Sequence, residues 1–318
     1  MNVYEKVRVA RLSVFSNTLL VLFKLVVGLM INSVSVLSEA IHSGLDLLAA
    51  LFALFAVRQS GKPPDEEHQF GHGKFENVAG VLEAVLIFLA AVWIIREAVQ
   101  KLFSGAHVAA PLWGLIVMGV SGGVNLIVSS VLMKTAHATD SVALEADAWH
   151  LRTDVYTSLG VAAGLFLLWL TGFQIFDPLI AIGIALLIVK ASFDLIAKAL
   201  LPLLDTKLPP EEERIIKEII SRYGRSYVSF HKLRSRKAGS ERHIDLHLVV
   251  PQNRSVATSH ELCDEIEKAI RERFADVHVL IHVEPCRRGD VCLTCPERCE
   301  LFPCPGGGSE RNLPKEGE

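Results

Sequence analysis

The sequence has no block of basic residues. Its 318 residues carry a formal net charge of only −3 at pH 7. Surfaces that bind nucleic acid need clustered Lys and Arg. No nucleic acid is therefore expected as a partner.

Polar residues are scarce over residues 12–200. The whole chain is 51% hydrophobic, and its mean hydropathy of +0.37 is too high for an ordinary soluble protein. Charged residues gather after residue 205. Such a split predicts a membrane domain over residues 1–205, a soluble domain over residues 206–285 and a flexible, cysteine-rich tail over residues 286–318.

Six segments are long and apolar enough for a transmembrane helix, which needs about 20 residues. They are Leu12–Met30, Val34–Val57, Val78–Phe103, Leu112–Met133, Val142–Leu170 and Pro178–Leu200. We expect a six-helix bundle, with Lys24 and Asn125 paired in its interior. No cleavable signal peptide is expected, because the first run is long enough to span and no small-residue cleavage site follows it.

Lys and Arg in the connections set the expected orientation. One side of the predicted membrane has Lys6, Arg8, Arg11, Arg58, Lys62, Lys74, Lys134 and the soluble domain, whereas only Lys101 lies near the other side. Both termini are therefore expected in the cytoplasm.

Histidine and aspartate recur four residues apart in two of these spans. His42 and Asp46 lie in the second span, and His150 and Asp154 lie in the fifth. A spacing of four places both side chains on one face of a helix. One such pair is explained by a hydrogen-bonded brace between helices, but a second pair with identical spacing favours a functional site.

These four side chains offer only nitrogen and oxygen ligands. Two imidazoles and two carboxylates suit tetrahedral Zn²⁺, and the absence of Cys and Met argues against monovalent copper. Histidine titrates near neutral pH and binds metal only when neutral. Metal and protons therefore compete for the site, which is the physical basis of metal/proton exchange.

The polar connection from Arg58 to Phe75 holds a second candidate site. Asp65, His68 and His72 have the spacing D-x₂-H-x₃-H, which can place them on one face as a weaker metal site. A solvated polar loop explains the same spacing equally well.

After Leu200 the pattern changes to short helices and strands. Helices are expected from Pro209 to about Tyr223 and from Ser255 to Phe274, and strands over Tyr227–Arg236, Arg242–Val250 and Val277–Val283, with a turn at Lys237–Ser240. The order αββαβ predicts a ferredoxin-like α+β domain with its helices on one face of the sheet.

Several nitrogen and oxygen donors of this domain predict a shared binuclear metal site, although each alone is more typical of a surface position. They are His231, His247, His260, His282 and Glu284. His282 and Glu284 are two residues apart on a strand, so they point to the same side.

Five cysteines lie close together in the tail: Cys286, Cys292, Cys295, Cys299 and Cys304. Cytoplasmic thiols stay reduced, so no disulfide framework is expected. The spacing suits a soft metal ion or an iron–sulfur cluster; a redox-sensitive tail without metal is the alternative. Cys263 is expected in the core of the soluble domain.

Several motifs in order along the chain resemble those of the cation diffusion facilitator family. They are Ser38–Asp46 (SEAIHSGLD), Pro63–Asp65, His68–Glu76 (HQFGHGKFE), Asp147–Asp154 (DAWHLRTD), Asp177–Pro178 and His282–Pro285. The resemblance extends from Leu12 to about Pro285. It omits the cysteine tail, whose role it does not explain.

The resemblance implies a homodimeric exporter, not an enzyme, that moves a divalent cation out of the cytoplasm in exchange for protons. It implies that the two His–Asp pairs form the transport site, that the loop donors form a second site, and that the soluble donors hold structural or regulatory Zn²⁺. Histidine on both helices resembles the zinc branch of the family. Where some relatives have Asp in the last motif, this chain has Glu284. We expect an integral protein of a prokaryotic inner (plasma) membrane.

Two other functional classes compete with this interpretation. A membrane-embedded zinc hydrolase needs an open coordination position and a general base; Glu39 and Glu145 are candidates, but neither lies in an HExxH arrangement. A membrane-tethered metal sensor would bind metal without moving it. For a transporter, Cd²⁺, Co²⁺, Ni²⁺ and Fe²⁺ are alternative substrates, because affinity order alone does not set selectivity.

Overall fold

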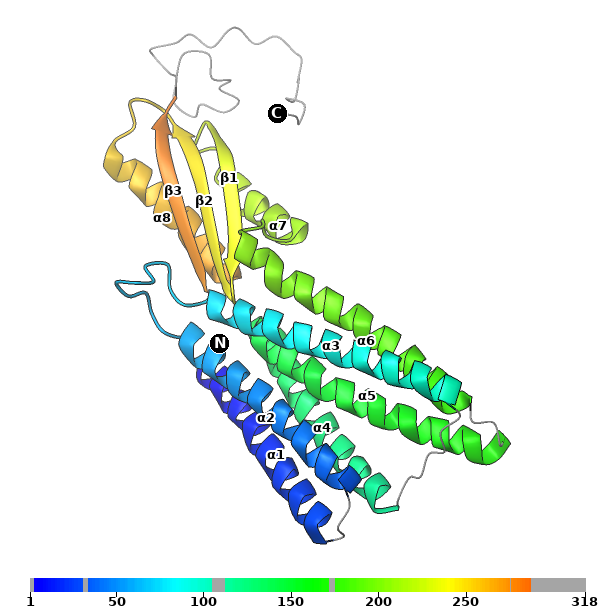
Figure 1. Ribbon diagram of the computed structural model, residues 1–318. Helices are drawn as coiled ribbons and strands as arrows, with labels where there is room; N and C mark the ends of the chain where they lie inside the picture. The colour runs from blue at the N-terminus through cyan, green and yellow to red at the C-terminus, as the bar shows by residue number, and fades with distance from the viewer. Residues whose placement is uncertain (1–2, 31–33, 105–111, 172–174, 275, 287–318) are drawn as a thin grey trace. The chain divides into compact units, whose positions relative to one another are not determined.

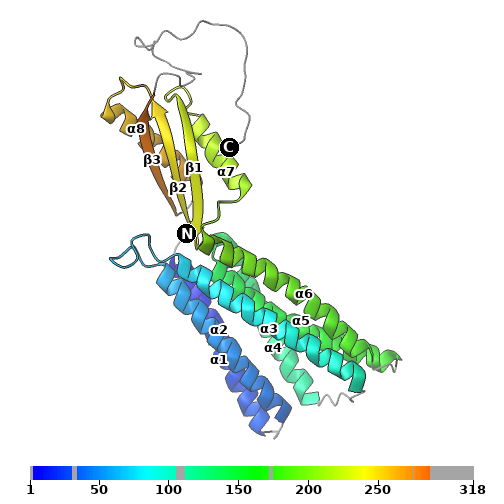
Figure 2. The same ribbon diagram turned by 45° about the horizontal axis from the view of Figure 1, so that its top comes forward.

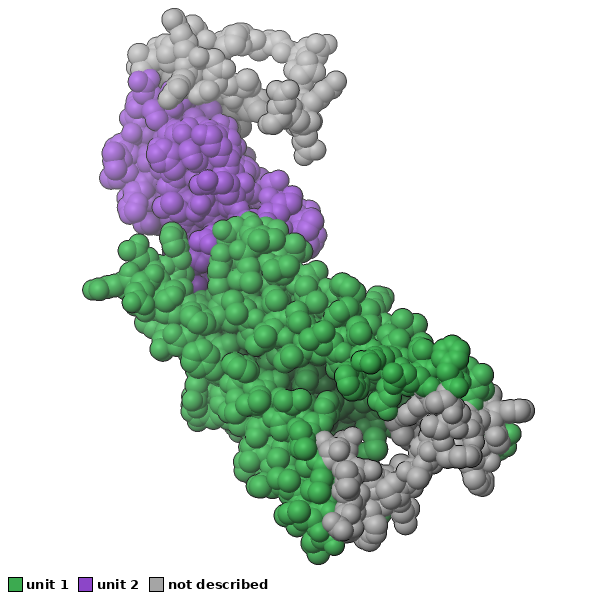
Figure 3. Space-filling view, in the orientation of Figure 1, with its two compact units in different colours: residues 1–206, 237–240 green, residues 207–236, 241–318 purple. Residues whose placement is uncertain are grey.

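The computed structural model describes residues 3–30, 34–104, 112–171, 175–274 and 276–286. These residues divide into two compact units, coloured separately in Figure 3. The first comprises residues 1–206 and 237–240, and the second comprises residues 207–236 and 241–318. Each unit is described by itself.

Six long helices make up most of the first unit. They are α1 (Val3–Met30), α2 (Val34–Ser60), α3 (Lys74–Ser104), α4 (Leu112–Thr139), α5 (Val142–Thr171) and α6 (Phe176–Leu200), and a short 3₁₀ helix η1 (Leu201–Leu204) follows. Figures 1 and 2 show them side by side as a bundle. Each predicted span lies within one of these helices.

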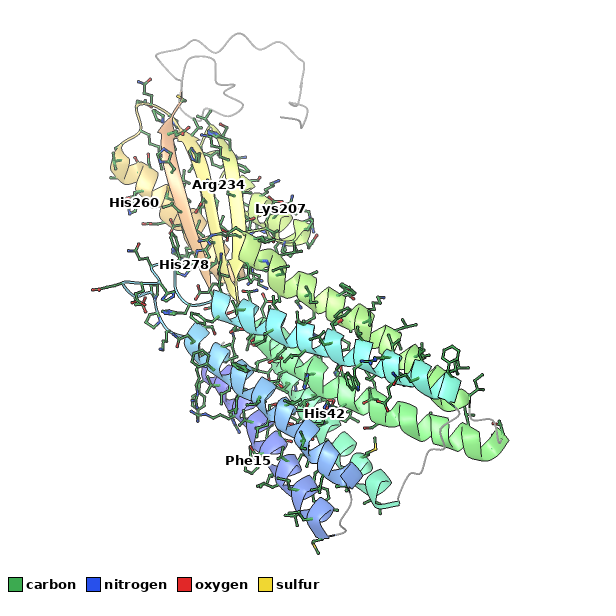
Figure 4. The ribbon with its side chains drawn as sticks, in the orientation of Figure 1. Phe15, His42, Lys207, Arg234, His260 and His278 are labelled. Atoms are coloured by element: carbon green, nitrogen blue, oxygen red, sulfur yellow. The ribbon has the colours of Figure 1, made fainter. Side chains whose placement is uncertain are left out.

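The bundle has small and polar side chains inside and large apolar side chains outside. Ala10, Ala50 and Ala53 are fully buried, whereas Phe15 is 62% exposed and lies on the outer surface of α1 (Figure 4). Small residues let membrane helices approach closely, and exposed apolar side chains suit contact with lipid tails. The first unit is therefore an integral membrane domain.

Among the described residues, five helices are long and apolar enough to cross a membrane: α1, α2, α3, α4 and α6. Several side chains in the second half of α5 lie outside the described residues, so the prediction that α5 forms a sixth span stays a prediction.

The second unit contains α7 (Pro210–Ser221), β1 (Ser229–Ala238), β2 (Glu241–Val250), α8 (Val256–Arg273) and β3 (Val277–Pro285). The strand order is β1-β2-β3, and β3 runs parallel to β2. Both helices lie on the same face of the sheet (Figures 1 and 2). The predicted αββαβ order and one-sided helices are confirmed.

The core of this unit joins that face of the sheet to the two helices. Ile244, Leu246 and Leu248 alternate along β2 and are at most 1% exposed, and they pack with residues of α7 and α8. Cys263 belongs to the same core, as predicted. The alternation leaves the other side chains of β2, including His243 and His247, on the opposite face of the sheet.

Four boundaries of the predicted strands were wrong by one or two residues: both ends of β1, the start of β2 and the end of β3. β1 begins at Ser229 and continues to Ala238, two residues beyond its predicted end. The turn is correspondingly shorter, with Gly239 at φ = 62°, a conformation that glycine adopts without strain. β3 continues to Pro285 because its pairing with β2 extends to the end of that strand.

Candidate metal centres

The two His–Asp pairs lie on facing sides of α2 and α5. Figure 4 shows His42 on α2 in the middle of the bundle. Nε2 of His150 is 3.0 Å from Oδ1 of Asp46, a contact that joins the two helices. Residues 104 positions apart in the chain therefore meet in one place, as the repeated spacing predicts.

The donor atoms of this cluster are close enough for one ion to gather them. One ligand atom each from His42, Asp46 and Asp154 lies within 4.8 Å of the others. Donors around tetrahedral Zn²⁺ are roughly 3.3–3.5 Å apart, given bonds of about 2.0–2.1 Å. Small movements of side chains would complete the set, and His150 would exchange its hydrogen bond with Asp46 for a metal bond.

Exposure differs sharply among these four residues. The side chain of His42 is 54% exposed, whereas those of Asp46 and His150 are 5% and 14% exposed. A cluster with one open ligand and buried partners allows an ion to enter stepwise.

Two polar residues from other helices support this cluster. Nδ2 of Asn125 on α4 donates a hydrogen bond to Oδ2 of Asp154 at 3.2 Å. This bond joins two helices, as predicted for Asn125. Lys24 of α1 is buried and donates to Oγ of Ser43 at 2.7 Å. Its charge also acts on Asp154. A nearby cation offsets part of the repulsion between the carboxylates.

The loop donors also come together. Nε2 of His72 is 3.2 Å and Nδ1 of His68 is 3.5 Å from the carboxylate of Asp65. The backbone N–H groups of His68 and Glu67 donate to the same carboxylate. The bond from His68, and secondarily the charge of His72, lower the pKa of Asp65 below its ordinary value of 3.8. The loop thus presents an ionised three-donor group.

A third group lies on the face of the sheet opposite the helices. Nδ1 of His247 is 2.7 Å from Oε1 of Glu284, and Nε2 of His231 is 3.4 Å from Oε2. The hydrogen bond with His247 lowers the pKa of Glu284 below 4.5. His282 is in register with His247, and its Nε2 is 3.8 Å from Glu284. Glutamate in place of aspartate still reaches all three histidines.

His260 lies apart from this group. It is on α8 (Figure 4), its side chain is 74% exposed, and its Nε2 is 3.7 Å from Asp264. Within one chain it does not join the donors on the sheet. Its membership of the site stays a prediction.

The cysteine tail falls almost wholly outside the described residues. This applies to Cys292, Cys295, Cys299 and Cys304. Cys286 is described; its thiol is free and buried beside Val228 and Val249. This apolar packing disfavours Cys286 as a ligand shared with the tail.

Three acidic residues inside the helices escaped the sequence-based prediction of sites. Glu76 and Glu83 of α3 and Asp147 of α5 are each at most 1% exposed. For Glu83 and Asp147 the signal was present, because a carboxylate inside a predicted span is rare; Glu76 lies just before the predicted span Val78–Phe103. Unlike the His–Asp pairs, these residues show no repeated spacing that would single them out.

Comparisons with known proteins agree on one family. The model described as the cation efflux transmembrane domain matches residues 10–204, and that of the cation efflux protein cytoplasmic domain matches residues 208–286. An uncharacterised transporter, sll1263 of Synechocystis, is 36% identical over 254 residues, which cover 80% of this chain and 82% of that protein.

Further relatives are described as cation-efflux pumps. The pump FieF of Cronobacter sakazakii is 32% identical over 269 residues, which cover 85% of this chain and 89% of that protein. Among solved structures, the zinc form of CzrB is 39% identical, covering 26% of this chain and 99% of that one, with a TM-score of 0.25. The metal-bound C-terminal domain of CzcD from Thermotoga maritima is 29% identical, covering 25% and 92%, with a TM-score of 0.23.

Proposed function

Because this chain belongs to the cation efflux, or cation diffusion facilitator, family, we propose that it exports Zn²⁺ from the cytoplasm in exchange for protons. Members of this family are transporters of metal cations rather than enzymes. The protein is an integral membrane transporter with a dimerisation domain. The choice of zinc, the use of protons and the cytoplasmic position of both termini belong to the proposal.

The observation that carries the proposal is the cluster formed by the facing His–Asp pairs of α2 and α5. His42, Asp46 and Asp154 present donor atoms within 4.8 Å of one another, and His150 contacts Asp46. Two imidazoles and two carboxylates favour zinc over softer ions. Cd²⁺, Co²⁺, Ni²⁺ and Fe²⁺ remain alternative cargoes for this donor set.

Transport follows from competition at these atoms. An ion arriving from the cytoplasm displaces protons from the imidazoles and carboxylates. When the bundle reopens on the other side, protons return to the same atoms and release the ion. Because metal and protons stabilise the site alternately, the exchange needs no covalent chemistry.

The two outer clusters have supporting roles in this proposal. The loop donors Asp65, His68 and His72 capture an ion weakly, since their carboxylate is half exposed. The donors on the sheet, His231, His247, His282 and Glu284, bind Zn²⁺ as a regulatory ion and draw two soluble domains together. This bound metal biases the equilibrium between the transporter's conformations.

Zinc uptake into proteoliposomes containing a pH-sensitive dye tests the proposal. Asp154→Ala should abolish zinc flux and zinc-driven proton flux together while leaving the dimer intact. The control is Glu145→Gln on the same helix, because Glu145 is paired with Lys198 at 2.5 Å and does not contact the cluster. Flux that persists in Asp154→Ala would place the transport site elsewhere.

The same assay addresses the competing functional classes. A membrane-tethered sensor would bind zinc in the wild type without moving it. The hydrolase loses support because Glu145, one of its candidate bases, is held by Lys198.

A further inference from the structure

Glu83 of α3 and Asp147 of α5 are buried carboxylates that lack well-formed hydrogen bonds among the described residues. Each is 1% exposed, and none of their four oxygens has a hydrogen bond of good geometry among the described residues, although the Ser13 side chain lies near Asp147. The residues described by the structure also include no cation paired with either one. Buried charges are normally paired or bound to a cation, so this arrangement needs an explanation.

The two carboxyl groups lie close enough for their charges to interact. Their neighbours in sequence, Ala84 and Ala146, pack in one apolar cluster together with Ile188 and Leu195 of α6. Two ionised carboxylates repel each other strongly in such an apolar surrounding. A proton on one of the two carboxyl groups removes this repulsion.

Asp147 and Glu83 differ in which groups interact with them. Asp147 interacts with Ser13 of α1, Asp46 of α2 and His150 of its own helix, whereas the only charged group that acts on Glu83 among the described residues is Asp147. Neither group is hydrogen-bonded to a metal ligand. Asp147 therefore interacts electrostatically both with the transport cluster and with Glu83.

We infer that Glu83 and Asp147 form a proton-binding site, separate from the metal ligands, that holds a proton displaced by zinc until the ion leaves. When zinc arrives, the proton displaced from the cluster passes to a carboxylate oxygen of Asp147, and the O–H proton of Asp147 passes to Glu83. When zinc leaves, the protons return by the reverse steps. The relay role rests on the proposed exchange of zinc for protons, but the existence of a protonated pair does not.

Infrared difference spectroscopy tests the protonated pair directly. The purified metal-free protein at neutral pH should show a carboxylic acid C=O band that shifts in D₂O. The isosteric variants Glu83→Gln and Asp147→Asn should each lose this band. Glu145→Gln, which removes an ion-paired carboxylate on α5, should keep it. A band unchanged in both variants overturns the inference.

Two further measurements are needed. The first tests whether the pair binds a proton or a metal ion, and the second tests whether it transfers protons or has only a structural role. Zinc added to Asp154→Ala should leave the band intact; loss of the band would show that the pair binds metal, contrary to the inference. In proteoliposomes, Glu83→Gln should still move zinc but exchange more protons per zinc than the wild type, because the proton displaced by zinc is no longer held within the protein. An unchanged ratio, or a loss of folded protein without spectral change, would reduce the pair to a structural feature and overturn the relay.

The outcomes distinguish failure of this inference from failure of the proposed function. If the wild type moves no zinc in liposomes, the exchange fails while the infrared bands still report on the pair. If zinc and protons exchange normally but the variants retain the band, the exchange stands and the proton site fails.

Discussion

Glu76 and Glu83 lie seven residues apart on α3, are equally buried, and have opposite surroundings. Oε1 of Glu76 accepts hydrogen bonds from Lys6 of α1 at 2.9 Å and from Ser60 of α2 at 2.8 Å. Its Oε2 accepts one from Ser141, immediately before α5. Glu83 has no hydrogen-bond donor among the described residues.

This difference shows that burial alone does not define the role of a carboxylate in the bundle. A buried ion is stable when a countercharge and further donors satisfy it, as at Glu76, which ties four helical segments together. Without donors, the neutral acid is favoured, as we infer for Glu83. The first group suits a structural role and the second suits proton binding.

The largest expected effect is on stability at Glu76. Glu76→Ala removes the countercharge of a buried lysine and should lower the free energy of unfolding by about 3–5 kcal/mol. Denaturant-induced unfolding of the detergent-solubilised protein measures this loss. Glu83→Gln, the matched variant on the same helix, should change stability by less than about 1 kcal/mol. Equal losses would remove the distinction between the two sites.

A double substitution sharpens the assignment of Glu76 to an ion pair. Lys6→Met combined with Glu76→Leu replaces both charges by apolar groups and should recover most of the lost stability, since such replacement of buried pairs is often nearly neutral. The coupling in the double-mutant cycle should be about 1–3 kcal/mol. Strictly additive losses would mean that the two residues stabilise the bundle independently.

Asp154, with a single described side-chain donor, should give an intermediate effect. Asn125→Ala removes the bond that orients this carboxylate and should weaken zinc binding to the transport cluster about 10-fold, the low end for an outer partner of a metal ligand. Calorimetric titration measures the affinity. Ser129→Ala is the control, because Oγ of Ser129 bonds only within α4; a similar loss there would point to a general change in that helix.

The smallest effect concerns Glu284 in the soluble domain. Because its pKa in the folded protein is lowered by His247, its bond contributes stability above the pKa of an ordinary glutamate. That contribution is lost as the pH falls through the lower folded-state pKa. Carboxyl chemical shifts of the metal-free protein should show this low pKa, and His247→Ala should raise it. An unchanged titration would show that His247 does not hold the carboxylate.

The sequence predicted much of the fold and of the main cluster because those features repeat locally. Apolar runs defined the helices, alternation in β2 defined its buried face, and the four-residue spacing identified His42 with Asp46 and His150 with Asp154. Strand ends were less well predicted because pairing with a neighbouring strand decides where a strand stops. His260 illustrates the same limit: its residue type suggested a ligand, but within one chain it lies on α8, apart from the sheet donors, so its role stays a prediction.

The sequence by itself thus determined which helices carry donors and on which face, since helical periodicity acts over a few residues. Only the tertiary structure decided which carboxylates would be satisfied. The partners of Glu76 come from positions 16 to 70 residues away, and no local pattern encodes their meeting. Glu83 and Asp147 likewise come near each other only because α3 packs against α5, with apolar neighbours and no well-formed hydrogen bond among the described residues.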